Sequence, residues 1–195
     1  MIEQVRPEAY FDTLSIAHKL DTQLDGGFKK EEVHLFSYFS SILFLFKGKP
    51  LADWGYQYQI DANGYPFSME IAKAIERDVQ NVLFEEKEEY LVVSARGVDQ
   101  FNILRSLTLF MEREEVIDAA CTTGVVLPYT SALRALLSEP EIEKKKKLED
   151  SSWLDQAEIY PKFLEVSKAV GVSSENLVIS AATWVDYLSS QNSGG

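Results

Sequence analysis

The chain has 195 residues, of which 46% are hydrophobic and 26% charged, which is enough apolar material for one ample domain or two small ones. Its 31 acidic and 19 basic residues give a formal net charge of −12, so the chain repels phosphate backbones and direct binding of nucleic acid is disfavoured. A single cysteine, Cys121, excludes an intramolecular disulfide and a multi-cysteine zinc site.

The cellular compartment of the protein is predicted from signals that the sequence lacks. Residues 1–7 do not have the charged-then-apolar order of a signal peptide, and no stretch approaches the ~20 apolar residues that a membrane-spanning helix needs. Together with the single cysteine, this predicts a protein of the reducing cytoplasm that makes no membrane contact.

Two helices are predicted in the first 46 residues. Residues 7–20 place their apolar side chains three or four positions apart, which is typical of a helix with one buried stripe. Residues 28–46 form the most hydrophobic segment, and their apolar side chains cover most of a helix circumference. Such a helix is buried on nearly all sides, either in this chain or against a partner.

Residues 54–60 alternate aromatic and polar side chains, which predicts a short strand or an extended loop. A strong turn signal follows at 61–66. Beyond it, Ser68 is placed to cap a helix that runs to about Phe84.

The next segment combines charge, a strand and a helix. Residues 85–89 are a solvated charge run, and residues 90–94 have the β-branched and aromatic content of a strand. Ser94 is placed to cap a helix that continues through Met111, and Gly97 in its first turn allows close packing against the strand.

The second half is predicted to be helical at 112–120, 128–137, 140–149, 153–170 and 179–188. Residues 122–127 carry β-branched side chains and a glycine, so they are a strand or a bend. The fold class is therefore mainly α with a small β element.

Residues that could carry chemistry are few. His18 and His34 lie on different predicted helices without a partner at metal-ligand spacing, and Cys121 has no family signature around it. No phosphate-binding loop is present. The run Lys144 to Lys147 is flanked by acidic residues, which favours a solvated helix face. We expect no catalytic residues, no metal and no cofactor.

An aromatic surplus suggests a different role. Phenylalanines of the 28–46 segment and aromatic residues of the 54–60 segment either pack in the core or form an exposed patch that anchors a partner. The residues of the predicted interaction patch are Phe36, Phe39, Phe44, Trp54, Tyr56 and Tyr58.

A family resemblance rests on residues 31–107. Here a helix that ends in Phe46-Lys47-Gly48-Lys49-Pro50-Leu51 precedes a second helix, an acidic link, a strand and Ser94-Ala95-Arg96-Gly97. This arrangement resembles the winged-helix element of the middle components of ABC-three-component defence systems and of Panacea-type antitoxin domains. The resemblance implies a winged-helix-like helical part at 1–111, with a C-terminal helical part at 112–190 packed with it as one unit. The composition of the last residues predicts a disordered tail at 191–195.

The resemblance also implies a function. Proteins of this kind are non-catalytic subunits that link an SMC-like or AAA-type ATPase to an effector such as a nuclease. This chain departs from the pattern, since Gly64-Tyr65-Pro66 replaces a Gly-Pro signature and the second helix carries Glu70, Glu76 and Asp78 against Lys73 and Arg77. These acidic residues favour a protein-binding use of the fold.

Three function classes follow from the sequence. The first is a non-enzymatic accessory or adaptor subunit of a prokaryotic multi-protein complex in anti-phage or anti-plasmid defence. The second is a transcriptional regulator, an antitoxin or an acidic inhibitor of a nucleic-acid enzyme, which a basic stripe on 71–83 or around Lys144 would favour. The third is an enzyme whose site joins Cys121 or His34 to carboxylates in a deep pocket.

Overall fold

The computed structural model describes residues 4–24, 26–150 and 152–192 and confirms a mainly α fold with small β elements. The two strand pairs are antiparallel, with Gln59 opposite Phe67 in the first and Phe84 opposite Val93 in the second. The helices are α1 (Pro7–Gln23), α2 (Lys30–Phe46), α3 (Met69–Gln80), α4 (Ala95–Arg105), α5 (Met111–Val126), α6 (Tyr129–Leu137), α7 (Pro140–Leu148), α8 (Gln156–Ala169) and α9 (Leu177–Asn192). The strands are β1 (Gln59–Ile60), β2 (Pro66–Phe67), β3 (Phe84–Lys87) and β4 (Tyr90–Val93), and short 3-10 helices cover Leu51–Trp54 and Thr108–Phe110.

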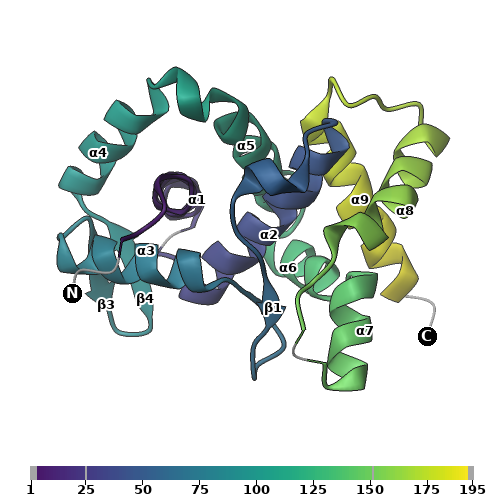
Figure 1. Cartoon of the computed structure of the whole chain (residues 1–195), viewed down its shortest axis with the longest axis horizontal. Helices are drawn as coiled ribbons and strands as arrows, with labels where there is room; N and C mark the ends of the chain where they lie inside the picture. Colours follow the sequence, from purple (N-terminus) through teal and green to yellow (C-terminus); the bar gives the residue numbers. More distant parts are fainter. Residues whose placement is uncertain (1–3, 25, 151, 193–195) are drawn as a thin grey trace.

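Helix α2 is the centre of the molecule. It passes between α1 and α3 on one side and α8 and α9 on the other, with α5 across it (Figure 1). Its aromatic side chains are covered by these helices, and Phe36, Phe39 and Phe44 are all at most 4% exposed. The prediction of a helix buried on nearly all sides is confirmed, and the covering partners belong to this chain.

The segment after α3 is a helix, a β-hairpin and another helix. The predicted strand at 90–94 is confirmed as β4, whereas the predicted charge run also forms a strand, β3, because its backbone pairs with β4 while its acidic side chains stay exposed. Glu88 at the hairpin tip has a φ of 56°. The helix predicted through Met111 instead ends at Arg105, and α5 begins at Met111.

Two residues predicted to shape the start of α4 do so. The Ser94 hydroxyl accepts a hydrogen bond from the Gly97 backbone N–H at 3.1 Å and donates one to the Val82 carbonyl at 2.8 Å. A Cβ at Gly97 would lie 2.4 Å from the Leu83 carbonyl oxygen, so only glycine allows this approach. Ser68 precedes α3 as predicted, but its side chain makes no cap bond.

We expect Ser94→Ala to lower the free energy of unfolding by about 1 kcal/mol, since it removes the cap of α4 and leaves the Gly97 N–H without its acceptor. Chemical denaturation monitored by circular dichroism measures the change. Ser106→Ala is the matched control, because that exposed hydroxyl donates to the Ile103 carbonyl within its own turn. Equal stability of the Ser94→Ala and Ser106→Ala variants would contradict a capping role.

The prediction of a strand or bend at 122–127 is wrong, because α5 continues to Val126. The hydroxyl of Thr123 donates to the Ala120 carbonyl at 2.6 Å, which satisfies this buried β-branched residue inside a helix. Gly124 accommodates the ring of Tyr129, since a Cβ there would lie 2.9 Å from the ring. The glycine therefore serves helix packing rather than a turn.

The ends of the last two helices also differ from prediction. Helix α8 begins at Gln156 rather than at 153, because Asp155 is its N-cap and accepts from the Ala157 N–H at 2.9 Å. Helix α9 runs to Asn192, so the first two residues of the predicted disordered tail at 191–195 are helical. The remaining three, 193–195, lie outside the described residues.

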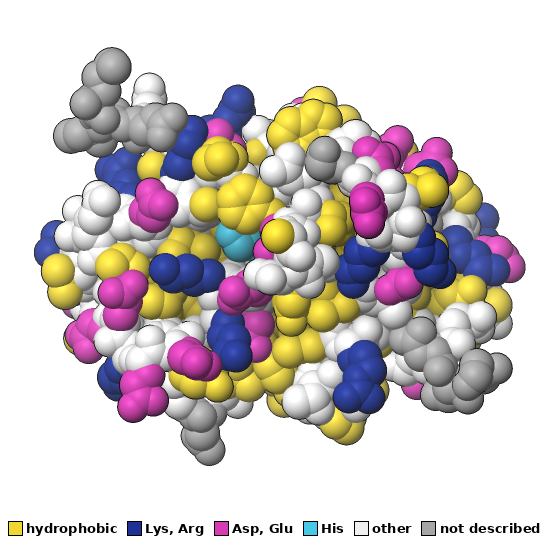
Figure 2. Space-filling view, turned by 90° about the horizontal axis from the view of Figure 1, so that it is seen from below, with side chains coloured by type: hydrophobic (Ala, Val, Ile, Leu, Met, Phe, Trp, Pro, Cys, Tyr) yellow, Lys and Arg dark blue, Asp and Glu magenta, His cyan; other side chains and the backbone are white. Residues whose placement is uncertain are grey.

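One cluster of buried hydrophobic side chains extends from Ala9 to Leu188 and draws on both halves of the chain. Among the described residues, no helix combines the length and the apolar character needed to cross a membrane. On the face shown in Figure 2, acidic and basic side chains are interspersed around hydrophobic ones, so this face carries no large field of one sign.

Candidate functional site

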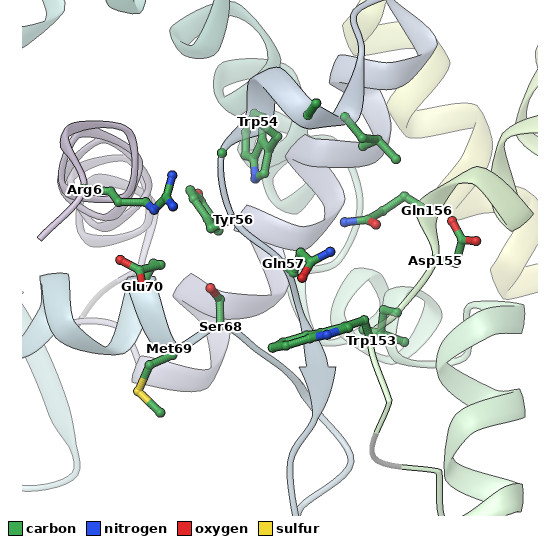
Figure 3. Close-up of a pocket in the computed structure, with 14 residues that line it drawn as sticks. Arg6, Trp54, Tyr56, Gln57, Ser68, Met69, Glu70, Trp153, Asp155 and Gln156 are labelled. Carbon is green, nitrogen blue, oxygen red and sulfur yellow. The ribbon is translucent and has the colours of Figure 1, made fainter.

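A cleft of about 820 Å³ opens where three distant segments meet (Figure 3). One wall is the stretch from Leu51 to Gln57, the second is the start of α3, and the third is the Trp153–Gln156 loop that enters α8. Arg6, just before α1, completes the lining. Its volume lies within the range of roughly 300 to 1,000 Å³ that is typical of ligand-binding pockets.

Two large apolar side chains remain exposed at this cleft. Trp153 is 54% exposed and Met69 is 55% exposed, and both line the cleft. The loop that carries Trp153 is held on both sides, because the Leu154 N–H donates to the Tyr58 carbonyl at 2.7 Å and Ser152 bonds Asp150. The Trp153 indole is therefore exposed on a loop that hydrogen bonds hold in place.

Polar groups also line the cleft. Gln57 and Ser68 face the cleft beside Trp153, and Gln156 points toward it from the α8 side (Figure 3). Gln156 is fixed by a 3.1 Å bond from its Nε2 to the Ser41 hydroxyl. The Ser68 hydroxyl is buried and has no hydrogen-bond partner among the described residues, so it is available to a ligand group that reaches it.

The charges at the cleft are mostly acidic. Glu70 and Asp155 contribute two carboxylates, and Arg6 contributes one guanidinium. Lys73 lies 3.8 Å from Glu70, one turn further along α3. Hydrogen-bonding amides, exposed apolar side chains and an acidic bias together suit a partner that is partly apolar and partly basic.

A buried chain of hydrogen bonds supports the cleft wall from behind. Trp54 Nε1 donates to the Tyr58 hydroxyl at 2.9 Å, and Ser37 bonds Tyr58 at 2.7 Å and Tyr56 at 2.9 Å. The Tyr56 hydroxyl donates to the carboxylate of Asp12. This last bond fixes the donor and acceptor roles in the other hydrogen bonds. Each hydroxyl then accepts one hydrogen bond and donates one, and the series of hydrogen bonds ends on a carboxylate.

Asp12 also forms an ion pair with Arg113. Arg113 donates from Nε to Asp12 Oδ1 at 2.8 Å and from Nη2 to Oδ2, and its guanidinium lies 3.9 Å from the Trp54 ring centroid. Burial raises the pKa of Asp12, and the two bonds from Arg113 oppose that rise. Burial alone would lower the pKa of Arg113. The charge of Asp12 and its hydrogen bond outweigh this effect, so the pKa of Arg113 is raised. The pair is a buried ion pair that positions Trp54 and Tyr56.

Titratable groups that sequence analysis singled out are not at this cleft. Cys121 is fully buried in α5, and burial raises the pKa of its thiol well above the usual range, so the nucleophilic thiolate is suppressed. His18 packs against Phe101, with ring centroids 4.5 Å apart. No group of three or more potential metal ligands occurs within the described part of the chain.

His34 does lie near carboxylates, in a second and smaller pocket that Glu31, Asp61 and Glu76 also line. Its Nδ1 accepts a hydrogen bond from the Ser68 backbone N–H at 3.1 Å. Burial lowers the pKa of His34 to about 4, and its Nδ1 lone pair is already engaged, so the ring does not act as a base near neutral pH. The arrangement provides a hydrogen-bond donor instead.

The lysine run is neutralised within α7 and by the loop after it. Lys144 lies 3.2 Å from Glu141, Lys145 lies 2.7 Å from Asp150, and Lys147 lies 3.7 Å from Glu143. Lys146 contacts the same glutamate at 4.0 Å. Lys145 is buried by these contacts, whereas Lys144 and Lys147 form the exposed face that the sequence predicted.

The predicted aromatic interaction patch lies inside the molecule. Phe36, Phe39, Phe44 and Tyr58 fill the core because helices from the second half of the chain cover α2, so they present no surface to a partner in this structure. The other two, Trp54 and Tyr56, line the cleft from its inner wall, as Figure 3 shows.

Sequence reasoning missed most of the cleft. Gln57 lay within the predicted aromatic segment, but Trp153, Met69 and Gln156 were not singled out. The helix predicted at 153–170 includes Trp153, although Asp155, two residues later, is an N-cap signal that places Trp153 outside the helix.

Comparison with known proteins gives no relative: no protein-family model, no curated protein and no solved structure matches this chain.

Proposed function

We propose that this chain is a non-enzymatic binding subunit that captures an extended segment of a protein partner in the cleft between the start of α3 and the loop before α8. The observation that carries the proposal is the pair of exposed side chains, Trp153 and Met69, together with hydrogen-bonding groups in a cleft of about 820 Å³. Exposed aromatic and methionine side chains beside hydrogen-bonding polar groups are typical of protein interfaces.

The chemistry of the segment follows from the lining. Amide groups of Gln57 and Gln156 can bond a peptide backbone, Trp153 offers a flat face to an apolar or cationic side chain, and the carboxylates favour Lys or Arg. The net charge of −12 acts in the same direction by attracting basic partners. In the setting that the family resemblance suggests, the segment belongs to an ATPase or a nuclease of a defence complex.

The test is affinity purification of the tagged protein from its native host with nuclease treatment, followed by mass spectrometry. We expect a partner in stoichiometric amount, and Trp153→Ala to reduce its recovery roughly tenfold or more, since truncation of an interface tryptophan commonly costs more than ~1.4 kcal/mol. Val170→Ala is the control, because Val170 is equally exposed, at 56%, but does not line the cleft.

Each outcome decides a different part of the proposal. Recovery lost with Trp153→Ala and kept with Val170→Ala supports capture in the cleft. Equal recovery with both variants contradicts the cleft as the contact. Recovery of the protein alone contradicts the binding-subunit function itself.

A further inference from the structure

A small pocket of about 200 Å³ lies between α2, β2 and α3, and none of its lining residues lines the cleft. Its walls are apolar and come from two elements, with Tyr65, Pro66 and Phe67 on the strand side and Ala72 and Ile75 on α3. Figure 2 shows a histidine side chain set in a hollow among hydrophobic, basic and acidic side chains. The size suits one aromatic ring with a short substituent, since a cavity of about 150 Å³ accommodates benzene.

His34 gives this pocket one oriented donor. Because its Nδ1 accepts from the Ser68 N–H, the proton of the neutral ring is on Nε2. The ring is stacked on Phe67, with centroids 4.9 Å apart, and His34 is 5% exposed. No hydrogen-bond partner for Nε2 occurs among the described residues. The pocket therefore combines apolar walls with an N–H group that is ready to donate.

The mouth of the pocket is acidic. Glu31, Asp61 and Glu76 line it, against one cation, Lys30, whose Nζ is 3.8 Å from Glu86 on the neighbouring hairpin. Burial raises the pKa of Tyr65, and the negative charge of Glu31 adds to this rise. The electrostatic field of the Glu31 carboxylate therefore reaches the pocket wall. Asp61 is held in place because its Oδ1 accepts from the backbone N–H groups of Asn63 and Tyr65.

We propose that this pocket binds a small primary amine that has an aromatic or apolar body and a hydrogen-bond acceptor at its far end. The acceptor receives the Nε2–H of His34, the body lies between Phe67 and Ile75, and the ammonium group faces the carboxylates of Glu31 and Glu76. This inference is independent of the proposed capture of a partner in the cleft.

The probe for the test is tyramine, which has a phenol oxygen, one ring and an ammonium group in that order. The chain contains two histidines, so the Cε1–H resonances in an NMR titration separate His34 from His18, with His18→Gln to assign them. We expect a saturable shift at His34 alone, at millimolar or lower probe concentration. Phenethylamine, which lacks the acceptor, and 3-(4-hydroxyphenyl)propionate, which reverses the charge, are each expected to bind at least tenfold more weakly.

Variants locate the binding by calorimetry. His34→Asn keeps an acceptor near the Ser68 N–H and removes the Nε2 donor, so we expect at least tenfold weaker binding of tyramine. Glu76→Gln removes an exposed charge and is expected to weaken binding several-fold. Ala72→Leu fills the pocket and is expected to abolish binding with His34 unchanged, so it decides the question if His34→Asn does not fold.

Three results would overturn the inference. The first is the absence of a saturable shift at His34 with tyramine. The second is unchanged affinity in folded Ala72→Leu or His34→Asn protein, as judged by the thermal unfolding midpoint. The third is equal affinity for the phenolic acid, which would remove the role of the acidic mouth.

Discussion

Arg113→Met is expected to lower the free energy of unfolding by about 3 to 5 kcal/mol, because it leaves the carboxylate of Asp12 buried without its cation. Asp12 is fully buried and takes two bonds from Arg113 and one from Tyr56. With the guanidinium gone, one hydroxyl donor remains for a buried charge, and the Trp54 ring loses the group stacked on it. Chemical denaturation at pH 7 measures the effect.

The matched control is Lys49→Met, which breaks the ion pair between Lys49 and Glu112 with the same replacement residue. That pair is partly exposed, and its loss is expected to cost less than ~1 kcal/mol. The double change Asp12→Asn with Arg113→Met is expected to be less destabilising than Arg113→Met alone, because no unpaired charge remains. A cost of Arg113→Met no larger than that of Lys49→Met would contradict a buried, ionised pair.

Asp78→Asn is expected to remove a large pH dependence of stability. Asp78 is fully buried on α3 and neither carboxylate oxygen has a hydrogen-bond partner among the described residues. Burial raises its pKa from 3.8 to about 8, and Arg77 opposes part of that rise. A carboxyl group in this setting is protonated in the folded state at neutral pH.

The sign follows from proton linkage. Below about pH 4 the carboxyl group is protonated in both the folded and the unfolded state, so it adds no pH dependence to the free energy of unfolding. Between pH 4 and 8 the unfolded chain releases the proton while the folded state keeps it, so the free energy of unfolding falls as pH rises. A shift of this size corresponds to at most roughly 6 kcal/mol.

The measurement is the free energy of unfolding of wild-type and Asp78→Asn protein at pH 5 and pH 8. We expect wild type to lose several kcal/mol relative to the variant across this interval. Burial also raises the pKa of Glu139 to about 7, so the difference between the two proteins isolates Asp78. Asp99→Asn, at an exposed aspartate, should retain the wild-type dependence. Parallel curves for wild type and Asp78→Asn would contradict the assignment.

The elements that local sequence signals mark were predicted well. The apolar periodicity of α1, the continuous hydrophobicity of α2 and the Ser94 cap of α4 each depend on residues within a few positions of one another. Local reasoning failed at 122–127, where β-branched residues suggested a strand, but a buried hydroxyl bond and the packing of Gly124 against Tyr129 favour a helix. Tertiary packing outweighs propensity there.

The candidate sites could not be predicted because their parts are distant in sequence. Asp12 and Arg113 are 101 positions apart, and Gln156 reaches Ser41 across 115 positions. His34 has the backbone of Ser68 as its partner, which no residue pattern can indicate. Trp153 gives no signal of its own, because exposure of an apolar side chain depends on where the loop before α8 is anchored.

The central position of α2 has a consequence for synthesis. The helices α5 and α8 that cover it are made long after it, because α8 ends at Ala169 while α2 ends at Phe46. At translation rates of roughly 5 to 20 residues per second, the phenylalanines of α2 wait on the order of 6 to 25 seconds for their last covering helix. During that interval the nascent chain displays a strongly apolar helix outside the ribosome, which is the kind of segment that chaperones bind. Production of this protein should therefore depend on chaperone capacity more than its folded stability would indicate.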